Sequence, residues 1–370
     1  MIAKRVQRVV PSGIRKIFDR ISQVKDPLDF SIGQPHFEVP APIQEAACRA
    51  IREGKSRYTV TQGIPELREK LRGHLKKTTG VEPEGLLVTS GTSGAILLAM
   101  MVLCDTDDEV LIPDPYFILY RNNVELCGGV AKYVDTYPDF RLRRDALEAA
   151  VTKKTKMVIL NNPVNPTGIA YSAEELRMVA GFARDHDLLV ISDEIYDAYS
   201  YDFPHECMLK YYEKTVLVNG LSKTYAMPGW RLGYAAGPKE ILDWMTTLQQ
   251  FSFVCANAPA QYAGVVALDF DMSPWIAEYK RKRDMVYEGL KDCFEVVKPQ
   301  GAFYIFPRCP WGTAEEFVSA AIEHRVLIVP GSACSRRDTH FRIAFAAPDE
   351  KIKQGIEILR TLAKDAPKRR

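Results

Sequence analysis

Three segments of the sequence hold side chains whose types and spacing could do chemistry. Lys223 follows Ser222 and stands eight residues before Arg231. Burial and nearby cations disfavour the charge of a lysine, which makes its amine nucleophilic toward a carbonyl. Asp193 follows the apolar run 188–192, which should carry its carboxylate into the interior. A buried charge needs a partner, and a cationic atom of a ligand could be that partner.

The third segment, residues 89–94 (TSGTSG), could hold a phosphate. Its small residues follow a predicted strand and open a predicted helix, where backbone N–H groups can approach an anion. Each of the three segments also has an ordinary explanation, namely a solvated lysine, an ion-paired aspartate and a simple turn. Taken singly, none of them establishes a function.

These segments share one place in the predicted fold. Short apolar runs alternate with stretches of helical periodicity through the first two-thirds of the chain, which predicts a mostly parallel α/β sheet. We expect strands at 86–89, 109–112, 130–136, 157–161, 188–192, 215–219 and 232–236. We also expect a helix over 173–185, opened by a capping box between Ser172 and Glu175. Asn161, Asp193 and Lys223 then lie at or just beyond the carboxyl ends of strands, where ligands of such sheets bind.

The pattern changes after Pro238, where long helical stretches lead into further short strands. We expect helices over 239–271 and 274–294, and strands at 302–306, 326–329 and 341–345. The fold class is therefore α/β, with a seven-stranded mostly parallel sheet covered by helices on both faces in a large domain, residues 42–273. Residues 1–41 and 274–370 would form a smaller α+β domain, and the ligand site would lie in the cleft between the two.

Composition narrows the class of protein. The 370 residues are 46% hydrophobic and 26% charged, which excludes a disordered or fibrous chain. A net charge of +2 leaves no overall field that would attract nucleic acid or an anionic membrane. The eight cysteines stand singly, and no apolar run approaches the ~20 residues of a membrane span. We expect a cytoplasmic enzyme without a metal, a nucleic-acid partner or a membrane partner.

Several motifs, taken together, resemble the class I aminotransferases of fold type I, the aspartate aminotransferase superfamily, which use pyridoxal 5'-phosphate. The resemblance runs from about residue 12 to residue 346. Besides residues 89–94 it rests on 31–37 (SIGQPHF), 58–68 (YTVTQGIPELR), 161–168 (NNPVNPTG), 192–196 (SDEIY), 222–234 (SKTYAMPGWRLGY), 301–304 (GAFY) and 341–345 (FRIAF). It implies exchange of an amino group between an L-α-amino acid and a 2-oxo acid.

The resemblance also implies roles for single residues. Lys223 would hold the cofactor as a Schiff base and then move the proton of the substrate Cα. Asp193 would pair with the protonated ring nitrogen, and Tyr196, with Asn165, would bond the phenolic oxygen. An aromatic ring would stack on the cofactor, and the resemblance favours Phe117 over the neighbouring Tyr116.

Phosphate and substrate contacts follow in the same way. The phosphate set is Gly91, Thr92, Ser93, Ser222 and Arg231. Tyr58 resembles the tyrosine that reaches the phosphate of the other subunit, so the active site would need a homodimer. Arg342 would grip the substrate α-carboxylate, assisted by Asn165 and the Gly33 backbone, and Ile14 would lie over the substrate side chain.

Two departures from the family bear on specificity. Dicarboxylate-specific relatives carry an extra cation at one of two positions, which we align with Ser93 and Ser252. Neither is a cation here, which argues against strict aspartate or glutamate specificity, unless Arg15 or another residue supplies the charge. His36 stands where many relatives have an acidic residue, and the sequence assigns it no role.

Two other functions stay open at this point. A cysteine-conjugate β-lyase would use the same cofactor residues, since these do not decide which bond breaks. A non-catalytic ligand-sensing domain is disfavoured because Lys223 and Asp193 are both present.

Overall fold

A seven-stranded sheet forms the centre of the protein. The computed structural model describes residues 2–9 and 26–365, so Ile14 and Arg15 lie outside the described residues. The strand order is β2-β8-β7-β6-β5-β3-β4, and every neighbouring pair is parallel except the two that involve β8. The bounds are β2 Gly85–Ser90, β3 Glu109–Asp114, β4 Val130–Asp135, β5 Thr155–Asn161, β6 Leu189–Asp193, β7 Thr215–Gly220 and β8 Leu232–Gly237. All seven predicted strands are confirmed.

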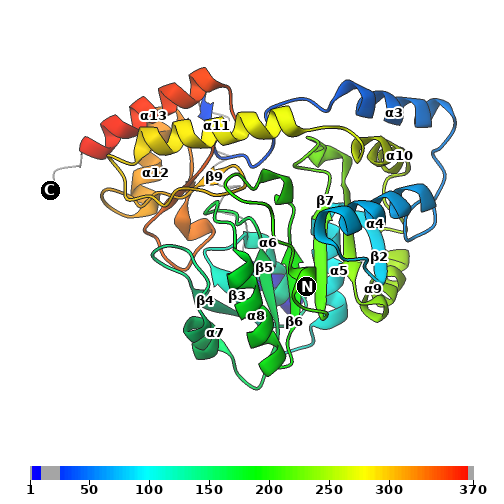
Figure 1. Ribbon diagram of the computed structural model, residues 1–370. Coiled ribbons are helices and arrows are strands. Elements are labelled where there is room, and N and C mark those ends of the chain that lie inside the picture. The colour runs from blue at the N-terminus through cyan, green and yellow to red at the C-terminus, as the bar shows by residue number, and fades with distance from the viewer. Residues whose placement is uncertain (1, 10–25, 366–370) are drawn as a thin grey trace.

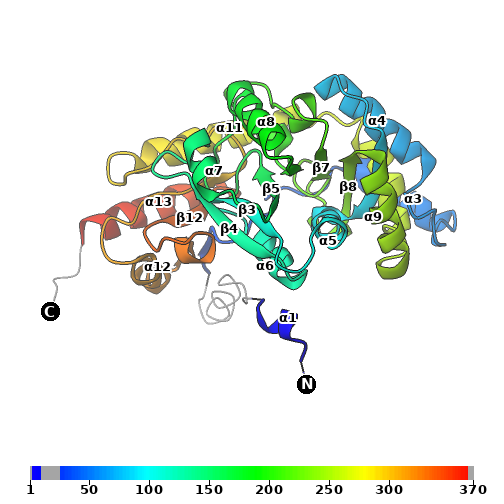
Figure 2. The ribbon, with the colours of Figure 1, turned by 90° about the horizontal axis from the view of Figure 1, so that it is seen from below.

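Helices cover both faces of this sheet because its buried strands alternate their side chains between two cores. On β5, Met157 and Ile159 pack with the helices α5, α6 and α9, whereas Val158 and Leu160 pack with α7 and α8. Figure 2 shows α7 and α8 on the opposite side of the sheet from α5 and α6. The bounds are α5 Gly91–Leu103, α6 Ile118–Leu126, α7 Arg144–Ala150, α8 Ala173–Asp185 and α9 Lys239–Ser252.

Near the β2 edge of the sheet, further helices cover the face that lies opposite α5 and α9. The helices α4 and α10 pack their apolar side chains on β2 and β8, and α3 packs on α10. Their bounds are α3 Ala41–Arg52, α4 Pro65–Thr79 and α10 Ala258–Ala267.

A second group of elements builds its own core beside the sheet. Its strands form two small sheets, of order β11-β12-β9 and β1-β10, so the segment near residue 28 lies against that near residue 326. In Figure 1, α11 and α13 run side by side above β9. The bounds are β1 Leu28–Asp29, β9 Tyr304–Ile305, β10 Val326–Leu327, β11 Val329–Pro330, β12 Phe341–Ala344, α11 Ser273–Leu290, α12 Ala314–Glu323 and α13 Asp349–Lys364. The short helix α1, Lys4–Gln7, does not belong to this group and lies near α6. The predicted domain boundaries stay a prediction.

Local sequence signals explain where several helices begin and why one predicted helix is wrong. The predicted helix α8 is confirmed, and its capping box is present, with the Ser172 side chain accepting from the Glu175 backbone N–H. The single helix expected over 239–271 is wrong, because the structure has two helices there, α9 and α10, with a non-helical segment between them. Val254 there has a φ of 65°, a left-handed conformation that a helix excludes, and Asn257 caps the first turn of α10.

The strand expected over 326–329 is likewise divided. Val326 and Leu327 pair with β1, whereas Val329 and Pro330 pair with β12, so two short strands belong to two different sheets. Within the part of the chain that the structure describes, no helix has the length and apolar character needed to cross a membrane. A cytoplasmic location stays a prediction.

Candidate active site

A cavity of about 250 Å³ lies where β5, β6 and β7 end, beside the first turn of α5. Because these three strands are parallel, their carboxyl ends meet at one edge of the sheet. The cavity brings together most of the predicted site residues. Those that line it are Gly33, Thr92, Ser93, Phe117, Asn165, Asp193, Tyr196, Ser222, Lys223, Arg231 and Arg342.

Lys223, just beyond β7, is held at both its backbone and its amine. The Tyr199 hydroxyl donates to the Lys223 carbonyl at 2.8 Å, and the Lys223 Nζ donates to the Gly33 carbonyl at 2.6 Å. Burial, followed by the positive charge of Arg342, lowers the pKa of Lys223 to about 8, although Asp193 opposes this shift. The amine therefore exchanges protons close to neutral pH, as the sequence predicted on physical grounds.

Asp193, the last residue of β6, is 3% exposed. Burial raises the pKa of its carboxyl to about 6, against the opposing effect of hydrogen bonds from Tyr120 and the backbone of Ile195. The Tyr120 hydroxyl donates to Asp193 Oδ2 at 2.8 Å. The sequence reasoning missed Tyr120, whose only signal is its place one helical turn after Phe117 at the start of α6.

Arg342, on β12, is anchored at two of its three guanidinium nitrogens. Nη1 donates to Asn165 Oδ1 at 3.0 Å, and Nη2 donates to the Ser31 carbonyl at 2.6 Å. Its Cζ lies 4.7 Å from the centre of the Tyr304 ring. The buried Nε has no hydrogen-bond partner. A buried donor without a partner is costly unless an anion occupies the site.

A chain of hydrogen bonds fixes the neighbouring groups. Asn161 Oδ1 accepts from the backbone N–H of Asn165 at 2.7 Å, and Asn161 Nδ2 donates to the Asp193 carbonyl at 2.9 Å. The Tyr196 and Tyr304 hydroxyls lie 2.7 Å apart. The sequence places Asn161 at the ligand edge of the sheet and Tyr304 within the motif 301–304, but it assigns neither residue a role of its own. Both line the cavity.

The first turn of α5 is built to meet an anion. No side chain caps this helix, and its first turn holds no acidic residue, so its N–H groups and dipole are free to bind negative charge. Gly91 has a φ of 68°, and a Cβ there would lie 2.4 Å from Arg231 Nη2. Gly91 does not line the cavity, and its role is to give the Arg231 guanidinium room beside the helix end.

The remaining predicted residues lie elsewhere. Phe117 lines the cavity, whereas Tyr116 is buried against Tyr133, with ring centroids 5.1 Å apart. Tyr58 is 84% exposed and does not line this cavity, and its role at another subunit stays a prediction. Ile14 is outside the described residues.

His36 has a structural role. Its Nδ1 lies 2.9 Å from the Tyr279 hydroxyl and its Nε2 lies 3.2 Å from Glu278, both on α11. Burial lowers the pKa of this imidazole. His36 thus ties the segment after β1 to α11, and it does not line the cavity.

The relatives of this chain are aminotransferases over its full length. Residues 25–359 match the family described as "Aminotransferase class I and II". A protein named "Probable aspartate aminotransferase" from Methanocaldococcus jannaschii is 39% identical over 375 residues, which cover 98% of this chain and 100% of that protein. "Aromatic-amino-acid aminotransferase 2" from Thermococcus litoralis is 36% identical, with 98% of each chain covered.

Solved structures also resemble this chain over nearly its full length. A crystal structure of a Pyrococcus protein named protein-A1 matches with a TM-score of 0.95 at 36% identity, covering 98% of both chains. The resemblance read from the sequence is confirmed: the chain belongs to the class I and II aminotransferase family and is an enzyme that transfers amino groups.

Proposed function

We propose that the protein exchanges an amino group between an L-α-amino acid and a 2-oxo acid, with pyridoxal 5'-phosphate bound to Lys223. One observation carries this proposal. A lysine whose pKa is lowered to about 8, a buried aspartate and a buried arginine with a free donor surround the same cavity.

The described residues fit the charges of this cofactor. The uncapped first turn of α5, with the exposed Arg231 and Ser222 beside it, suits a phosphate dianion. Asp193 suits a protonated ring nitrogen, because an uncompensated carboxylate at 3% exposure gains from a cationic partner. Phe117 offers an aromatic face to a planar ring.

Each of these side chains has a separate task in the reaction. When bound, pyridoxal phosphate supplies an electron sink that takes up the electron pair left by the broken Cα–H bond. Lys223, as the neutral amine, accepts the proton from the substrate Cα and returns it during the exchange. Asp193, ionised above about pH 6, keeps the ring nitrogen protonated.

Arg342 orients the substrate by its α-carboxylate. Asn165 and the Ser31 carbonyl fix the plane of the guanidinium, and the unpartnered Nε is left for the incoming anion. A fixed guanidinium binds a carboxylate with little further loss of entropy.

The homodimer has support in an exposed apolar patch, made of Tyr58, Val60, Phe251, Phe253 and Val254. The side chain of Tyr58 is 84% exposed and that of Phe251 is 82% exposed. A patch of large exposed apolar side chains marks a surface that another molecule covers. The two parts of the patch are adjacent, since Gln249 donates to the Thr61 carbonyl at 2.8 Å. A Phe253 ring atom lies 3.8 Å from where a Cβ on Gly94 would be, so the patch adjoins α5. A second copy of the chain is the proposed cover.

The attachment of the cofactor is the first prediction. Borohydride reduction of the purified enzyme followed by peptide mapping should locate the cofactor on Lys223. Lys223→Ala should lose about 10²–10⁴-fold in turnover, because the proton-transfer group is gone. Lys214→Ala, which removes an exposed lysine paired with Asp187, is the control and should keep full activity. A label on any other lysine contradicts the assignment.

The second prediction concerns pH and Tyr120. Cofactor binding needs ionised Asp193, so affinity should be complete above pH 6 and fall as the pH drops through about 6. The Tyr120 hydrogen bond lowers this pKa, so Tyr120→Phe should move the midpoint upward. Absorbance titrations of the cofactor-free enzyme from pH 5 to 8.5 measure the midpoint.

Tyr116→Phe is the matched control, because Tyr116 is buried against Tyr133 and is no hydrogen-bond partner of Asp193. It should leave the midpoint unmoved. Titration of the cofactor phosphate is common to all variants, so the difference between them isolates Asp193. Equal midpoints in the wild type and Tyr120→Phe would refute the assignment of this bond.

The third prediction concerns the amino donor. Among the described residues that line the cavity, the cations are Lys223, Arg231 and Arg342, and each already has a proposed partner. Alanine, methionine or aromatic donors should therefore be accepted at least as well as aspartate, since no further cation offsets desolvation of a distal carboxylate. A kcat/KM for aspartate more than about tenfold above every neutral donor, or ~1.4 kcal/mol, would contradict this.

Variants sharpen this test. Ser93→Lys should raise the preference for aspartate over alanine about tenfold, whereas Ser93→Gln, which adds similar bulk without charge, should not. Arg342→Ala should weaken all donors together, because every α-amino acid presents the same carboxylate.

The fourth prediction concerns assembly. Sedimentation at assay concentration should give twice the chain mass of 41.7 kDa. Phe251→Asp, in the apolar patch, should shift the enzyme toward the monomer and reduce activity in proportion. Val130→Asp, at a 40% exposed apolar residue on β4, is the control and should stay dimeric. A fully active wild-type monomer would overturn the proposal.

A further inference from the structure

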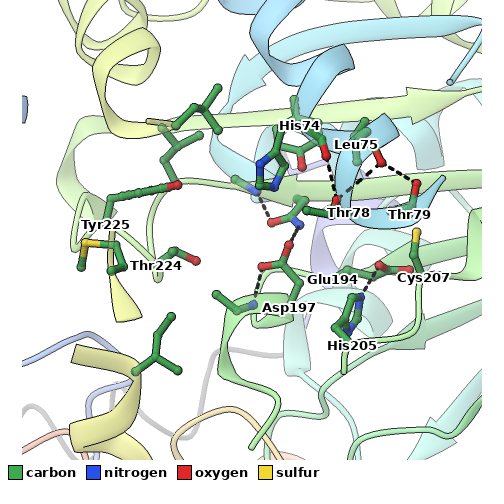
Figure 3. A pocket seen from close by; sticks show the side chains of 18 of the residues that line it. His74, Leu75, Thr78, Thr79, Glu194, Asp197, His205, Cys207, Thr224 and Tyr225 are labelled. Atoms are coloured by element: carbon green, nitrogen blue, oxygen red, sulfur yellow. Dashed lines mark hydrogen bonds and ion pairs between the residues drawn. The ribbon is translucent and has the colours of Figure 1, made fainter. Parts of the chain in front are cut away.

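A second cavity, of about 420 Å³, lies between α4, the segments that follow β6 and β7, and the start of α11 (Figure 3). It shares no lining residue with the candidate active site. The chain alternates between the two: Asp193 lines the first cavity and Glu194 the second, and Lys223 lines the first and Thr224 the second. Nothing in the proposed reaction uses this second space.

Negative charge dominates its described lining residues. They include Glu194, Asp197 and Asp271, but no lysine or arginine. Glu194 is compensated, because His205 Nε2 lies 2.6 Å from its carboxylate. Burial opposes protonation of His205, but the contact with Glu194 leaves the pKa of this imidazole above its usual value. Glu194 and His205 therefore form a closed pair.

Asp197 has no such partner. Its carboxylate accepts from Asn219 Nδ2 at 2.8 Å and from the Ala198 backbone N–H at 2.7 Å, and no cation of the described chain forms an ion pair with it. Figure 3 shows Asp197 at the centre of the cavity wall, below His74 and Thr78. A half-buried carboxylate whose hydrogen-bond donors are all neutral favours a cationic ligand.

Aromatic side chains with free hydroxyls lie around the same space. Tyr225 is 8% and Tyr234 3% exposed. Both line the cavity, and neither hydroxyl has a hydrogen-bond partner among the described residues. Phe270 adds a third aromatic ring. Aromatic faces attract organic cations, and Leu75, with the other apolar residues of the wall, suits a hydrocarbon body.

We propose that this cavity binds a small organic ammonium ion with an apolar body, its charged nitrogen beside Asp197. An anion such as a 2-oxo acid would meet uncompensated negative charge there. A bound metal ion has no support either, because the described residues hold no group of three or more His, Cys, Asp or Glu side chains arranged as metal ligands. The proposal does not depend on the identity of the amino donor or of the cofactor.

The probe is benzyltrimethylammonium, whose nitrogen carries no hydrogen and so cannot condense with an aldehyde in the active site. Calorimetric titration into the purified full-length enzyme should give saturable binding of one probe per chain. Benzoate, of similar size and opposite charge, should bind at least about tenfold more weakly. The probe should also bind more tightly than benzoate after borohydride has reduced the Schiff base in the active site.

Three variants and one control variant test the location. Asp197→Asn should weaken the probe about tenfold, and Tyr225→Phe should weaken it less, because the ring remains. Asp271→Asn keeps a side-chain oxygen for Ser273 and gives a second charge variant if Asp197→Asn folds poorly. Asp292→Asn, which removes an exposed carboxylate outside the cavity, should bind like the wild type. Absence of saturable binding, or unchanged affinity in both Asp197→Asn and Asp271→Asn, would overturn the proposal.

Discussion

Desolvation of charge where β6 and β7 end is the constraint on which the site depends. Burial shifts the carboxyl of Asp193 and the amine of Lys223 in opposite directions, to pKa values of about 6 and about 8. Both groups are thereby less stable as isolated ions than they would be in water. The surrounding hydrogen bonds hold them in place without neutralising them. The rest of the fold can be understood as the means of keeping two such groups close and dry.

The sequence predicted those strands, helices and site residues that a local pattern or a long motif reveals. The seven strands follow from runs of apolar residues, and α8 follows from a cap of two residues three positions apart. Long-range partners had no such signal. Tyr120 bonds Asp193 across 73 positions, and Tyr196 meets Tyr304 across 108. The second cavity is lined from several stretches of chain that lie far apart in the sequence, and its unpaired Asp197 could not be told from an ordinary surface aspartate.

Close backbone approach is the second requirement of the site. A Cβ on Gly233 would lie 2.6 Å from the Gly91 carbonyl carbon and 2.7 Å from the Thr92 nitrogen. β8 can therefore pass directly behind the turn that opens α5 only because residue 233 has no side chain. The same approach positions the first turn of α5, whose Thr92 and Ser93 line the cavity. Packing of the sheet and the proposed binding of an anion therefore depend on the same two glycines, Gly91 and Gly233.

The direction of one strand has a consequence for how such a site could be rebuilt. β8 runs antiparallel to its neighbours, so its first residues, rather than its last, lie at the ligand edge. Arg231 immediately precedes β8 and reaches the helix end for this reason. If the strand were reversed, the same sequence position would move to the opposite edge, roughly 20 Å away for six residues. A redesign that kept the sheet but reversed β8 would therefore move Arg231 away from the ligand edge, and it would also displace the side chains with which β8 packs in both cores, such as Tyr234 and Ala235.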